Sequence, residues 1–392
     1  MRKIAIATGT RADWGLLSGI ADGLRRRPDC DVVILATNMH LQPQFGMTVD
    51  EIRADGWDGD SLVSVPMACG GETAVGTAEA MSSCLSGMAH ALERVSPDLI
   101  VILGDRFEML ATASAALIMR IPIVHIAGGE ISEGAIDDSI RHAITKMASL
   151  HLTSTEPYRR RVIAMGEDPA RVINTGSIGV WNLMHEPVMT RAELEESTGF
   201  SFEPGSLLVT YHPATLDDGD TSARCSALLE ALDRFPGSNI LITYPNNDSH
   251  GRVIIDLIER YAASRPGRVR VIPSLGKRRY LSALRYVSAV VGNSSSGIIE
   301  VPSTGTPTVN VGIRQQGRLC GPGVIHCGDS ADEIAEAIAH ALSQQGQATA
   351  ARRENPYSRP DTLQLSVEAI AETPLETLRS KRFYDLPHDH TC

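Results

Sequence analysis

The sequence predicts an α/β protein built from two doubly wound, Rossmann-like domains. Along most of its 392 residues, short apolar runs alternate with longer amphipathic stretches. The apolar runs carry few polar residues, which is typical of parallel strands covered by helices on both faces. A Pro- and Gly-containing stretch at about 186–205 reads as a linker between two such series. We therefore expect an N-terminal domain over 1–185, a C-terminal domain over 186–365, and a C-terminal helix and tail over 366–392 that packs back on the first domain.

The first series alternates strands with helices. Apolar runs predict strands over 4–8, 32–37, 99–104, 121–127, 149–154 and 172–176. Amphipathic spacing predicts helices over 13–27, 73–95, 108–119, 136–147 and 157–165. The first apolar run is short and ends in polar residues, so it indicates a buried strand rather than a signal peptide.

The second series repeats the pattern. Strands are predicted over 207–213, 239–245, 269–273, 288–293 and 307–312, and helices over 222–235, 252–263, 277–286 and 297–304. The breaker NPYSRP then precedes a further helix over 362–379.

The acidic composition limits the partners that we expect. The formal net charge is −11, whereas nucleic acids and anionic membranes attract basic proteins. No apolar run is long enough to span a membrane. The seven scattered cysteines contain no CxxC pair, which favours free thiols in a reducing cytoplasm. We expect a cytoplasmic protein with no nucleic-acid or membrane partner.

Ligands of open α/β sheets bind at the carboxyl ends of the strands, and polar clusters follow several predicted strands here. Arg11 lies on a Gly-containing turn after the first strand, where it could clamp a diphosphate or a carboxylate. The alternative is a plain turn in which Asp13 caps the next helix. Asp105 and Arg106 follow the strand over 99–104, and a carboxylate beside an arginine is a candidate acid or base. Asp105 could equally cap the helix that follows.

The densest polar stretch runs from residue 125 to residue 142. A helix over 136–147 places Asp138 and His142 four residues apart on one face. The spacing of its His and carboxylate residues matches no standard metal site, so we predict no metal. The polar side chains of this stretch include those of His125, Glu130, Asp137, Asp138, Arg141 and His142.

The second domain offers His212 at the end of its first strand and a run of serines, 294–296, after the strand over 288–293. Small residues before a helix leave backbone N–H groups open to a phosphate, and Glu300 one turn later could accept hydrogen bonds from ribose. The alternative for the serines is an ordinary helix N-cap.

Taken together, these residues resemble the UDP-N-acetylglucosamine 2-epimerase family over residues 1–345. The resemblance rests on GTRADWG, NMH, GDRFE, HIAGGE, IDDSIRHAITKM, HP, YPNND, GNSSSGIIEV and GTPTVNVGIRQQGR. The non-hydrolysing branch typically has an HVEAGLR-like stretch where this chain has HIAGGEISEGAIDD, so the chain looks most like the hydrolysing branch.

The resemblance implies a glycosyltransferase-B-like fold with the active site in a cleft between the domains, and no cofactor. It implies conversion of UDP-N-acetylglucosamine to N-acetylmannosamine and UDP, for nonulosonate (sialic acid-type) synthesis. UDP-N,N′-diacetylbacillosamine in the legionaminic acid pathway, a GDP-linked sugar, and the non-hydrolysing reaction are the alternatives. A glycosyltransferase and a nucleotide-sugar sensor of the same architecture are less favoured, because no acceptor signal occurs and a sensor needs no carboxylate cluster. We expect a homodimer, the commonest symmetric assembly.

The resemblance also assigns roles. Ser294 and Ser295 would hold the diphosphate and Glu300 the ribose, while Arg11 and His212 reach the phosphates. The catalytic residues that we predict are Asp105, Glu130, Asp137 and His212. The remaining predicted substrate contacts are Arg106, His125, Asp138, His142, Asn246 and Arg314.

Two positions depart from the family pattern. Ala127 stands where members with a HIEGGE-like stretch have a catalytic glutamate, so that role would pass to Glu130, Asp137 or another group, or the substrate differs. Leu16 stands where some members have a lysine near the nucleotide.

Overall fold

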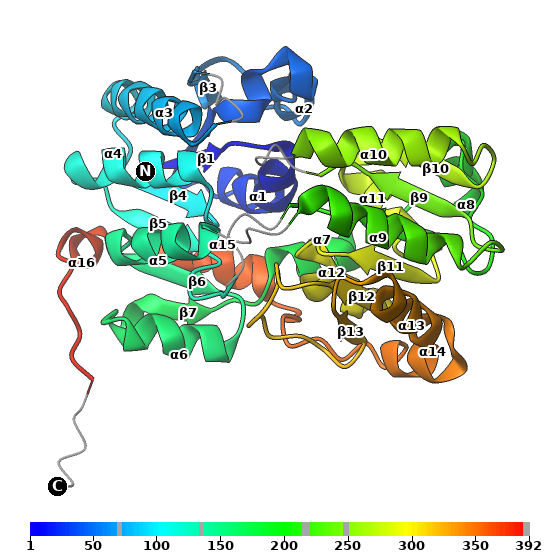
Figure 1. The fold of residues 1–392 in the computed structure, drawn as a ribbon. Coiled ribbons are helices and arrows are strands. Elements are labelled where there is room, and N and C mark those ends of the chain that lie inside the picture. Colours follow the sequence, from blue (N-terminus) through cyan, green and yellow to red (C-terminus); the bar gives the residue numbers. More distant parts are fainter. Residues whose placement is uncertain (69–72, 133–135, 214–219, 246–250, 387–392) are drawn as a thin grey trace, which may run out of the picture. The chain divides into compact units, whose positions relative to one another are not determined.

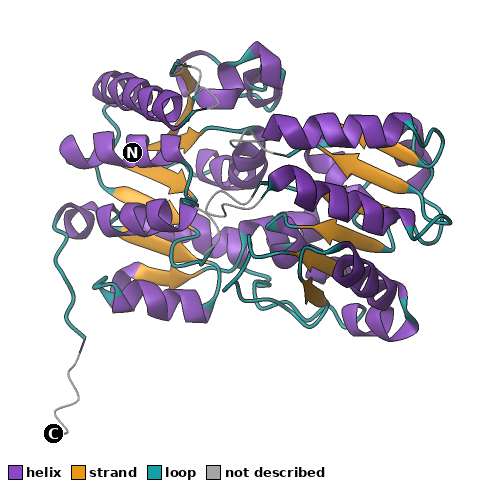
Figure 2. Ribbon diagram, in the orientation of Figure 1, coloured by secondary structure: helices purple, strands orange, loops and turns teal. Residues whose placement is uncertain are grey.

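The computed structural model describes residues 1–68, 73–132, 136–213, 220–245 and 251–386. Its contacts divide the chain into two compact units. Unit 1 contains Met1–Glu130, Asp137–Trp181 and Arg359–Cys392, and unit 2 contains Ile131–Ile136 and Asn182–Ser358. Both are parallel sheets flanked by helices, as Figure 2 shows. The domain bounds at 185 and 365 stay predictions.

Unit 1 is built on a seven-stranded sheet in the order β3-β2-β1-β4-β5-β6-β7. All of its pairings are parallel, with Thr8 opposite Ala36 where β1 and β2 end. Helices cover both faces, which is why the central strands are apolar throughout. The strands are β1 (Arg2–Thr8), β2 (Cys30–Ala36), β3 (Leu62–Ser64), β4 (Leu99–Leu103), β5 (Ile123–Ile126), β6 (Leu150–Thr153) and β7 (Val172–Asn174).

The helices of unit 1 include the end of the chain. Helix α15 packs on α1, and Arg2 donates to the carbonyl oxygens of Ile370 and Thr373 at 2.6 and 2.8 Å. The helices are α1 (Arg11–Arg25), α2 (Val49–Ala54), α3 (Ala74–Val95), α4 (Phe107–Ile118), α5 (Asp137–Met147), α6 (Glu156–Ala164), α15 (Thr362–Glu372) and α16 (Leu375–Arg379), while α7 (Ile178–His185) runs from unit 1 into unit 2.

Unit 2 is built on a six-stranded parallel sheet in the order β10-β9-β8-β11-β12-β13 (Figure 1). Its strands are β8 (Leu207–Thr210), β9 (Ile240–Thr243), β10 (Val269–Ile272), β11 (Ala289–Gly292), β12 (Thr308–Val311) and β13 (Val324–Cys327). Its helices are α8 (Arg191–Thr198), α9 (Thr221–Asp233), α10 (Gly251–Ala263), α11 (Gly276–Ala283), α12 (Ser296–Ile299), α13 (Ala331–Leu342) and α14 (Gln344–Ala350).

The structure corrects three of the predicted elements. The stretch over 186–205 is not a plain linker, because α8 forms there with a capping box between Thr190 and Glu193. The helix predicted over 297–304 is only the four-residue α12, followed by a 3₁₀ turn that contains Pro302. The helix predicted over 362–379 is interrupted before Pro374, which has no N–H to continue the ladder.

In each sheet the strand order reverses at one point, between β1 and β4 in unit 1 and between β8 and β11 in unit 2. The carboxyl ends of the strands beside such a switch point are where doubly wound folds bind ligands. A residue that we predicted for the site lies two or three positions after each of these four strands. These residues are Arg11 after β1, Asp105 after β4, His212 after β8 and Ser294 after β11. None of the described helices is long and apolar enough to cross a membrane.

Candidate active site

In unit 1, one buried arginine gathers three of the predicted acidic residues. Arg141 is only 1% exposed and comes from α5. Its guanidinium donates to Asp138 Oδ1 at 3.1 Å and to the backbone oxygen of Glu130 at 2.9 Å, and it forms an ion pair with Asp105. Burial acts to lower the pKa of Arg141, but the surrounding carboxylates outweigh it and raise that pKa. The arginine therefore stays charged and fixes Asp105 at the end of β4.

The side chains of Glu130 and His142 extend this cluster. The Ser154 hydroxyl donates to Glu130 Oε1 at 2.8 Å, which orients a carboxyl group that is 5% exposed. His142 Nε2 lies 3.3 Å from Asp138 Oδ2, so the predicted pair on one face of the helix is confirmed. Burial lowers the pKa of His142, although Asp138 opposes the shift, so the ring is neutral near pH 7 and could give or take a proton.

A second group of charged side chains, which includes Arg106 and Glu108, lies next to Gly9 in the turn that follows β1. Arg106 Nε donates to Glu108 Oε1 at 2.9 Å, and Glu108 is fully buried. A Cβ at Gly9 would lie only 2.5 Å from the same carboxylate oxygen, so any larger residue there would displace the Glu108 carboxylate. Burial raises the pKa of Asp13 to about 6; Arg106 opposes that shift and Glu108 adds to it.

The helix caps differ from the alternatives that the sequence left open. Thr10, not Asp13, is the N-cap of α1, and the two residues form a capping box with bonds of 3.0 and 3.2 Å. Arg106, not Asp105, is the N-cap of α4. Arg11, on the first turn of α1, lies 3.7 Å from Glu51.

His125 is buried and contacts the backbone next to Asp105. Its side chain is fully buried, with Nε2 donating to the carbonyl oxygen of Gly104 at 2.8 Å and Nδ1 3.2 Å from the hydroxyl of Thr145. Burial lowers its pKa to about 3, so the ring is neutral. In the structure, His125 fixes the carbonyl group immediately before Asp105.

Three further positions named in the sequence analysis remain. Asp137 is the first residue of α5 and is half-buried. Ala127 has the left-handed backbone angle φ of 65°, which is uncommon for a residue with a side chain and marks the sharp turn toward Glu130. Asn246 lies outside the described residues.

In unit 2, the side chain of Asn293 ties the two central strands together. Its amide accepts from the backbone N–H of His212 at 2.7 Å and donates to the carbonyl oxygen of the same residue at 2.8 Å. The Asn293 carbonyl oxygen accepts from Arg314 at 3.1 Å and from Gln315 at 2.9 Å. This one residue therefore brings the predicted His212 and Arg314 to the serine turn that begins at Ser294.

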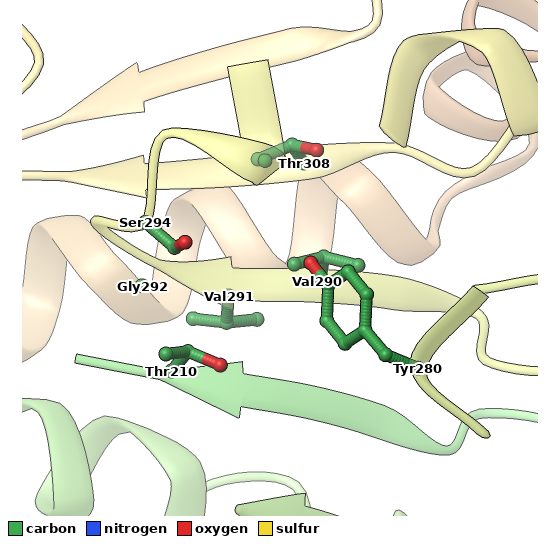
Figure 3. A pocket seen from close by; sticks show the side chains of 8 residues that line it. Thr210, Tyr280, Val290, Val291, Gly292, Ser294 and Thr308 are labelled. Carbon is green, nitrogen blue, oxygen red and sulfur yellow. The ribbon is translucent and has the colours of Figure 1, made fainter. Parts of the chain in front are cut away.

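The turn itself requires a glycine and borders a small pocket. Gly292 has φ of 137°, and a Cβ there would collide with the carbonyl oxygen of Thr210. Thr210, Tyr280, Ser294 and Thr308 are among the residues that line the pocket, and Figure 3 shows them around β11.

The serine turn leads into helix α12. Ser295 is the N-cap of α12, as the alternative expects, but its side chain makes no cap bond. The Tyr280 hydroxyl lies 2.7 Å from Ser296 Oγ. Burial raises the pKa of Tyr280, the nearby Glu300 carboxylate adds to this, and the phenol stays protonated. Since α12 has only four residues, its dipole is weak, and any anion here would depend on the turn's own N–H and hydroxyl groups.

Sequence analysis did not predict Asn293, Tyr280 or Ser154 as site residues. Asn293 follows the apolar run of β11 directly, and that position was the available signal. Tyr280 and Ser154 lie far from their partners along the chain, so no local pattern pairs them.

The comparisons with known proteins agree with this arrangement. A profile of the UDP-N-acetylglucosamine 2-epimerase family matches residues 22–371. The chain belongs to this family. Its fold is the two-domain α/β architecture of the glycosyltransferase-B type. The chain superposes on the crystal structure of UDP-GlcNAc 2-epimerase from Neisseria meningitidis bound to UDP-GlcNAc with a TM-score of 0.78. That superposition covers 95% of this chain and all of the other, at 17% sequence identity.

Two curated relatives are considerably more similar in sequence. The GDP/UDP-N,N′-diacetylbacillosamine 2-epimerase (hydrolyzing) of Campylobacter jejuni is 37% identical over 81% of this chain and 82% of its own length. Polysialic acid biosynthesis protein P7 of Escherichia coli is 33% identical over 99% of this chain and 98% of its own length.

The two units carry different kinds of polar group. Unit 1 supplies ionisable carboxyl, imidazole and guanidinium groups, suited to proton transfer. Unit 2 supplies N–H and hydroxyl donors with Arg314, suited to an anionic group. Within the described part of the chain, no group of three or more His, Cys, Asp and Glu side chains is arranged to hold a metal ion.

Proposed function

We propose that the protein is a hydrolysing 2-epimerase, which converts a UDP-linked 2-acetamido sugar into UDP and the free sugar inverted at C2. The observation that carries the proposal is the cluster around Arg141, which collects Asp105, Glu130 and Asp138 at the carboxyl edge of one sheet. A C–H proton next to an acetamido group is poorly acidic, so its removal needs a placed base and a coupled leaving group.

The first step is elimination. Asp105 takes the proton from C2, the C2–H electron pair forms the C1–C2 double bond, and the C1–O bond to the diphosphate breaks. The products are a 2-acetamidoglucal and UDP. The ion pair with Arg141 holds Asp105 in place.

The departing diphosphate gains charge during this step and needs donors. The serine turn, His212 and Arg314 are gathered by Asn293 in unit 2, and this common support favours their acting on one anionic group. Arg11, on the first turn of α1, is the proposed donor from unit 1. Glu300 is the proposed partner of the ribose hydroxyls.

The second step is hydration of the glycal. A water oxygen adds to C1, its proton is taken by a carboxylate, and C2 receives a proton from the opposite stereochemical sense. Glu130 is the first choice for this carboxylate because Ser154 orients it, and Asp137 at the start of α5 is the second. Since Ala127 has no side chain beyond a methyl group, it cannot take this role.

For the sugar, we propose UDP-N,N′-diacetylbacillosamine ahead of UDP-N-acetylglucosamine, the substrate that the sequence favoured. The hydrolysing relative named for the first sugar is 37% identical. The polysialic acid protein, 33% identical over almost the whole chain, supports a place in nonulosonate synthesis for either sugar. We retain the homodimer and the cytoplasmic location as proposals.

The test is a substrate panel in D₂O. Purified protein is incubated with UDP-N,N′-diacetylbacillosamine, with UDP-N-acetylglucosamine and with the GDP-linked form of the first sugar, and products are identified by NMR. The expected result is free UDP and a free sugar inverted at C2, with deuterium at C2. A C2-inverted sugar still attached to UDP would mean the non-hydrolysing reaction. Hydrogen at C2 with retained configuration would mean simple hydrolysis, and no turnover would favour a transferase or a sensor.

A further inference from the structure

Outside the proposed active site, unit 2 holds a thiol, an imidazole and an amide in contact. Cys320 Sγ lies 3.4 Å from Nε2 of His326, and Nδ1 of His326 lies 3.1 Å from the side-chain nitrogen of Asn310. Asn310 and His326 face each other across β12 and β13, and β13 is the edge strand of the sheet. His326 is exposed and Cys320 is partly exposed, so a small reagent can reach the thiol.

This order of groups is that of an activated nucleophile: an attacking atom, a base, and a third group that orients the base. Although the His326 residue as a whole is exposed, desolvation of its ring lowers its pKa, and burial raises the pKa of the Cys320 thiol. Both groups are therefore neutral near pH 7. A neutral imidazole beside a thiol is a base in the form that can accept its proton. The Asn310 nitrogen that faces Nδ1 is a donor and leaves the ring proton on Nε2, so Nε2 becomes the base when the amide turns over and its oxygen accepts from Nδ1–H.

We propose that Cys320 is a base-activated nucleophilic thiol and a covalent modification site for soft electrophiles. The sulfur attacks an electrophilic carbon, the C–S bond forms, and the leaving group departs with the electrons of its bond. The thiol proton passes to Nε2 of His326 and from there to water. With iodoacetamide, the leaving group is iodide and the product is a stable thioether.

The neighbouring Cys327 provides an internal comparison. It lies one residue after His326 on β13 and donates to the backbone oxygen of Asn310, at 3.7 Å. Burial raises its pKa to about 11, and the carboxylates of Glu333 and Asp329 add to the shift. Cys327 is also partly exposed and therefore controls for access of the reagent. Because its carboxylate neighbours also differ from those of Cys320, the contribution of the imidazole itself is isolated by His326→Gln.

An adduct at Cys320 would act on a segment with defined contacts. Two residues earlier, Arg318 donates to the carbonyl oxygen of Ile131 and to the hydroxyl of Ser132, each at 3.0 Å. One residue earlier, the Leu319 carbonyl oxygen accepts from Tyr357 at 2.7 Å. The thiol therefore belongs to an anchored segment and not to a free loop tip.

The experiment measures alkylation at each cysteine of the full-length protein. Iodoacetamide is added at pH 7, and quantitative peptide mass spectrometry gives a rate for each thiol. We expect Cys320 to react roughly tenfold or more faster than Cys327. His326→Gln should slow the alkylation of Cys320 by a similar factor. A factor of this size is at or below the low end of the rate enhancement that a general base provides. His90→Gln, which changes an exposed histidine of α3 in unit 1, should leave the rate unchanged.

Two outcomes overturn the proposal: a Cys320 no faster than Cys327 in the unmodified protein, or a Cys320 rate that His326→Gln leaves as it was. Cys225 is fully buried and monitors unfolding, because it reacts only if the unit opens. Should His326→Gln expose Cys225, the ratio of Cys320 to Cys327 in the unmodified protein decides the question by itself.

Discussion

Replacement of Asn293 by alanine tests whether one amide organises the nucleotide side of the site. Asn293 is 3% exposed, and its side chain makes two hydrogen bonds to the backbone of His212, at 2.7 and 2.8 Å. Asn293→Ala removes both bonds, and it leaves a buried N–H and a buried C=O of His212 without these partners.

The size of the effect follows from those two bonds. At about 0.5–1.5 kcal/mol each, their loss destabilises the protein by about 1–3 kcal/mol. Asn293→Asp keeps the acceptor for the His212 N–H and loses only the donor, so we expect roughly half of that cost. If His212 is displaced and its bond to a phosphate is lost, UDP affinity falls by about 1.5–3 kcal/mol, roughly ten- to a hundredfold.

Urea unfolding gives the stability of each variant, and isothermal titration calorimetry gives its affinity for UDP. The control is Asn239→Ala, which removes a single solvent-exposed bond to Ser201 just before β9, at the opposite edge of the same sheet. We expect that control to change stability by less than Asn293→Ala and to leave UDP affinity as it is. The reasoning is refuted if Asn293→Ala binds UDP as tightly as the unmodified protein, or if it costs no more stability than Asn239→Ala.

Four further outcomes are expected. Asp105→Asn should abolish turnover, because the amide cannot accept the C2 proton, while calorimetry should find UDP affinity within about tenfold, or 1.4 kcal/mol. Glu130→Gln should lower kcat roughly a hundredfold or more in single-turnover assays if Glu130 activates the water, whereas an unchanged kcat would shift that role to Asp137. Glu300→Ala should weaken UDP binding by about 1.5–3 kcal/mol by calorimetry, and unchanged affinity would contradict its assignment to the ribose. Asp13 has a folded pKa of about 6, above its ordinary 3.8, so its contribution to stability is present below pH 3.8 and is lost as the pH rises through 6; the Tm of Asp13→Asn relative to the unmodified protein should therefore rise from pH 4 to pH 8, and a constant difference would contradict the shift.

The sequence was sufficient to predict the parallel sheets, since apolar runs buried on both faces are a strong local signal. Strands β1, β4, β8 and β11 fall on predicted runs, and the polar residues at their carboxyl ends are those that follow the runs in the sequence. The three-residue β3 gave too short a pattern to detect. The edge strand β13 was missed because exposed His326 interrupts its apolar run.

The contacts that hold the site could not be predicted, because they join residues far apart along the chain. Arg141 and Asp105 are 36 residues apart, and Asn293 and His212 are 81 residues apart. The residue types showed that acids, an arginine and serines gather at strand ends, but not which side chain holds which. The α8 helix was missed because of a local signal that was misread. Its flanking Pro and Gly residues suggested a linker, although Gly199 is the left-handed cap that ends the helix.

The groups that we propose for proton transfer and those that we propose for the diphosphate differ for a physical reason. Proton transfer at carbon needs groups that change charge, and such groups must be held by an opposite charge when they are buried, as Arg141 holds Asp105. A leaving diphosphate is already anionic and would be repelled by carboxylates, so its side of the site needs donors that stay neutral or positive. On the proposed nucleotide side, the Asn293 side-chain amide holds His212, and the Asn293 backbone carbonyl oxygen accepts from Arg314, so neither contact adds a negative charge beside the serine turn. An aspartate at 293 would keep one of the two bonds to His212 and introduce that charge. The comparison of Asn293→Asp with Asn293→Ala therefore separates geometry from electrostatics: if the aspartate variant is the more stable of the two and yet binds UDP more weakly, charge at this turn governs nucleotide binding.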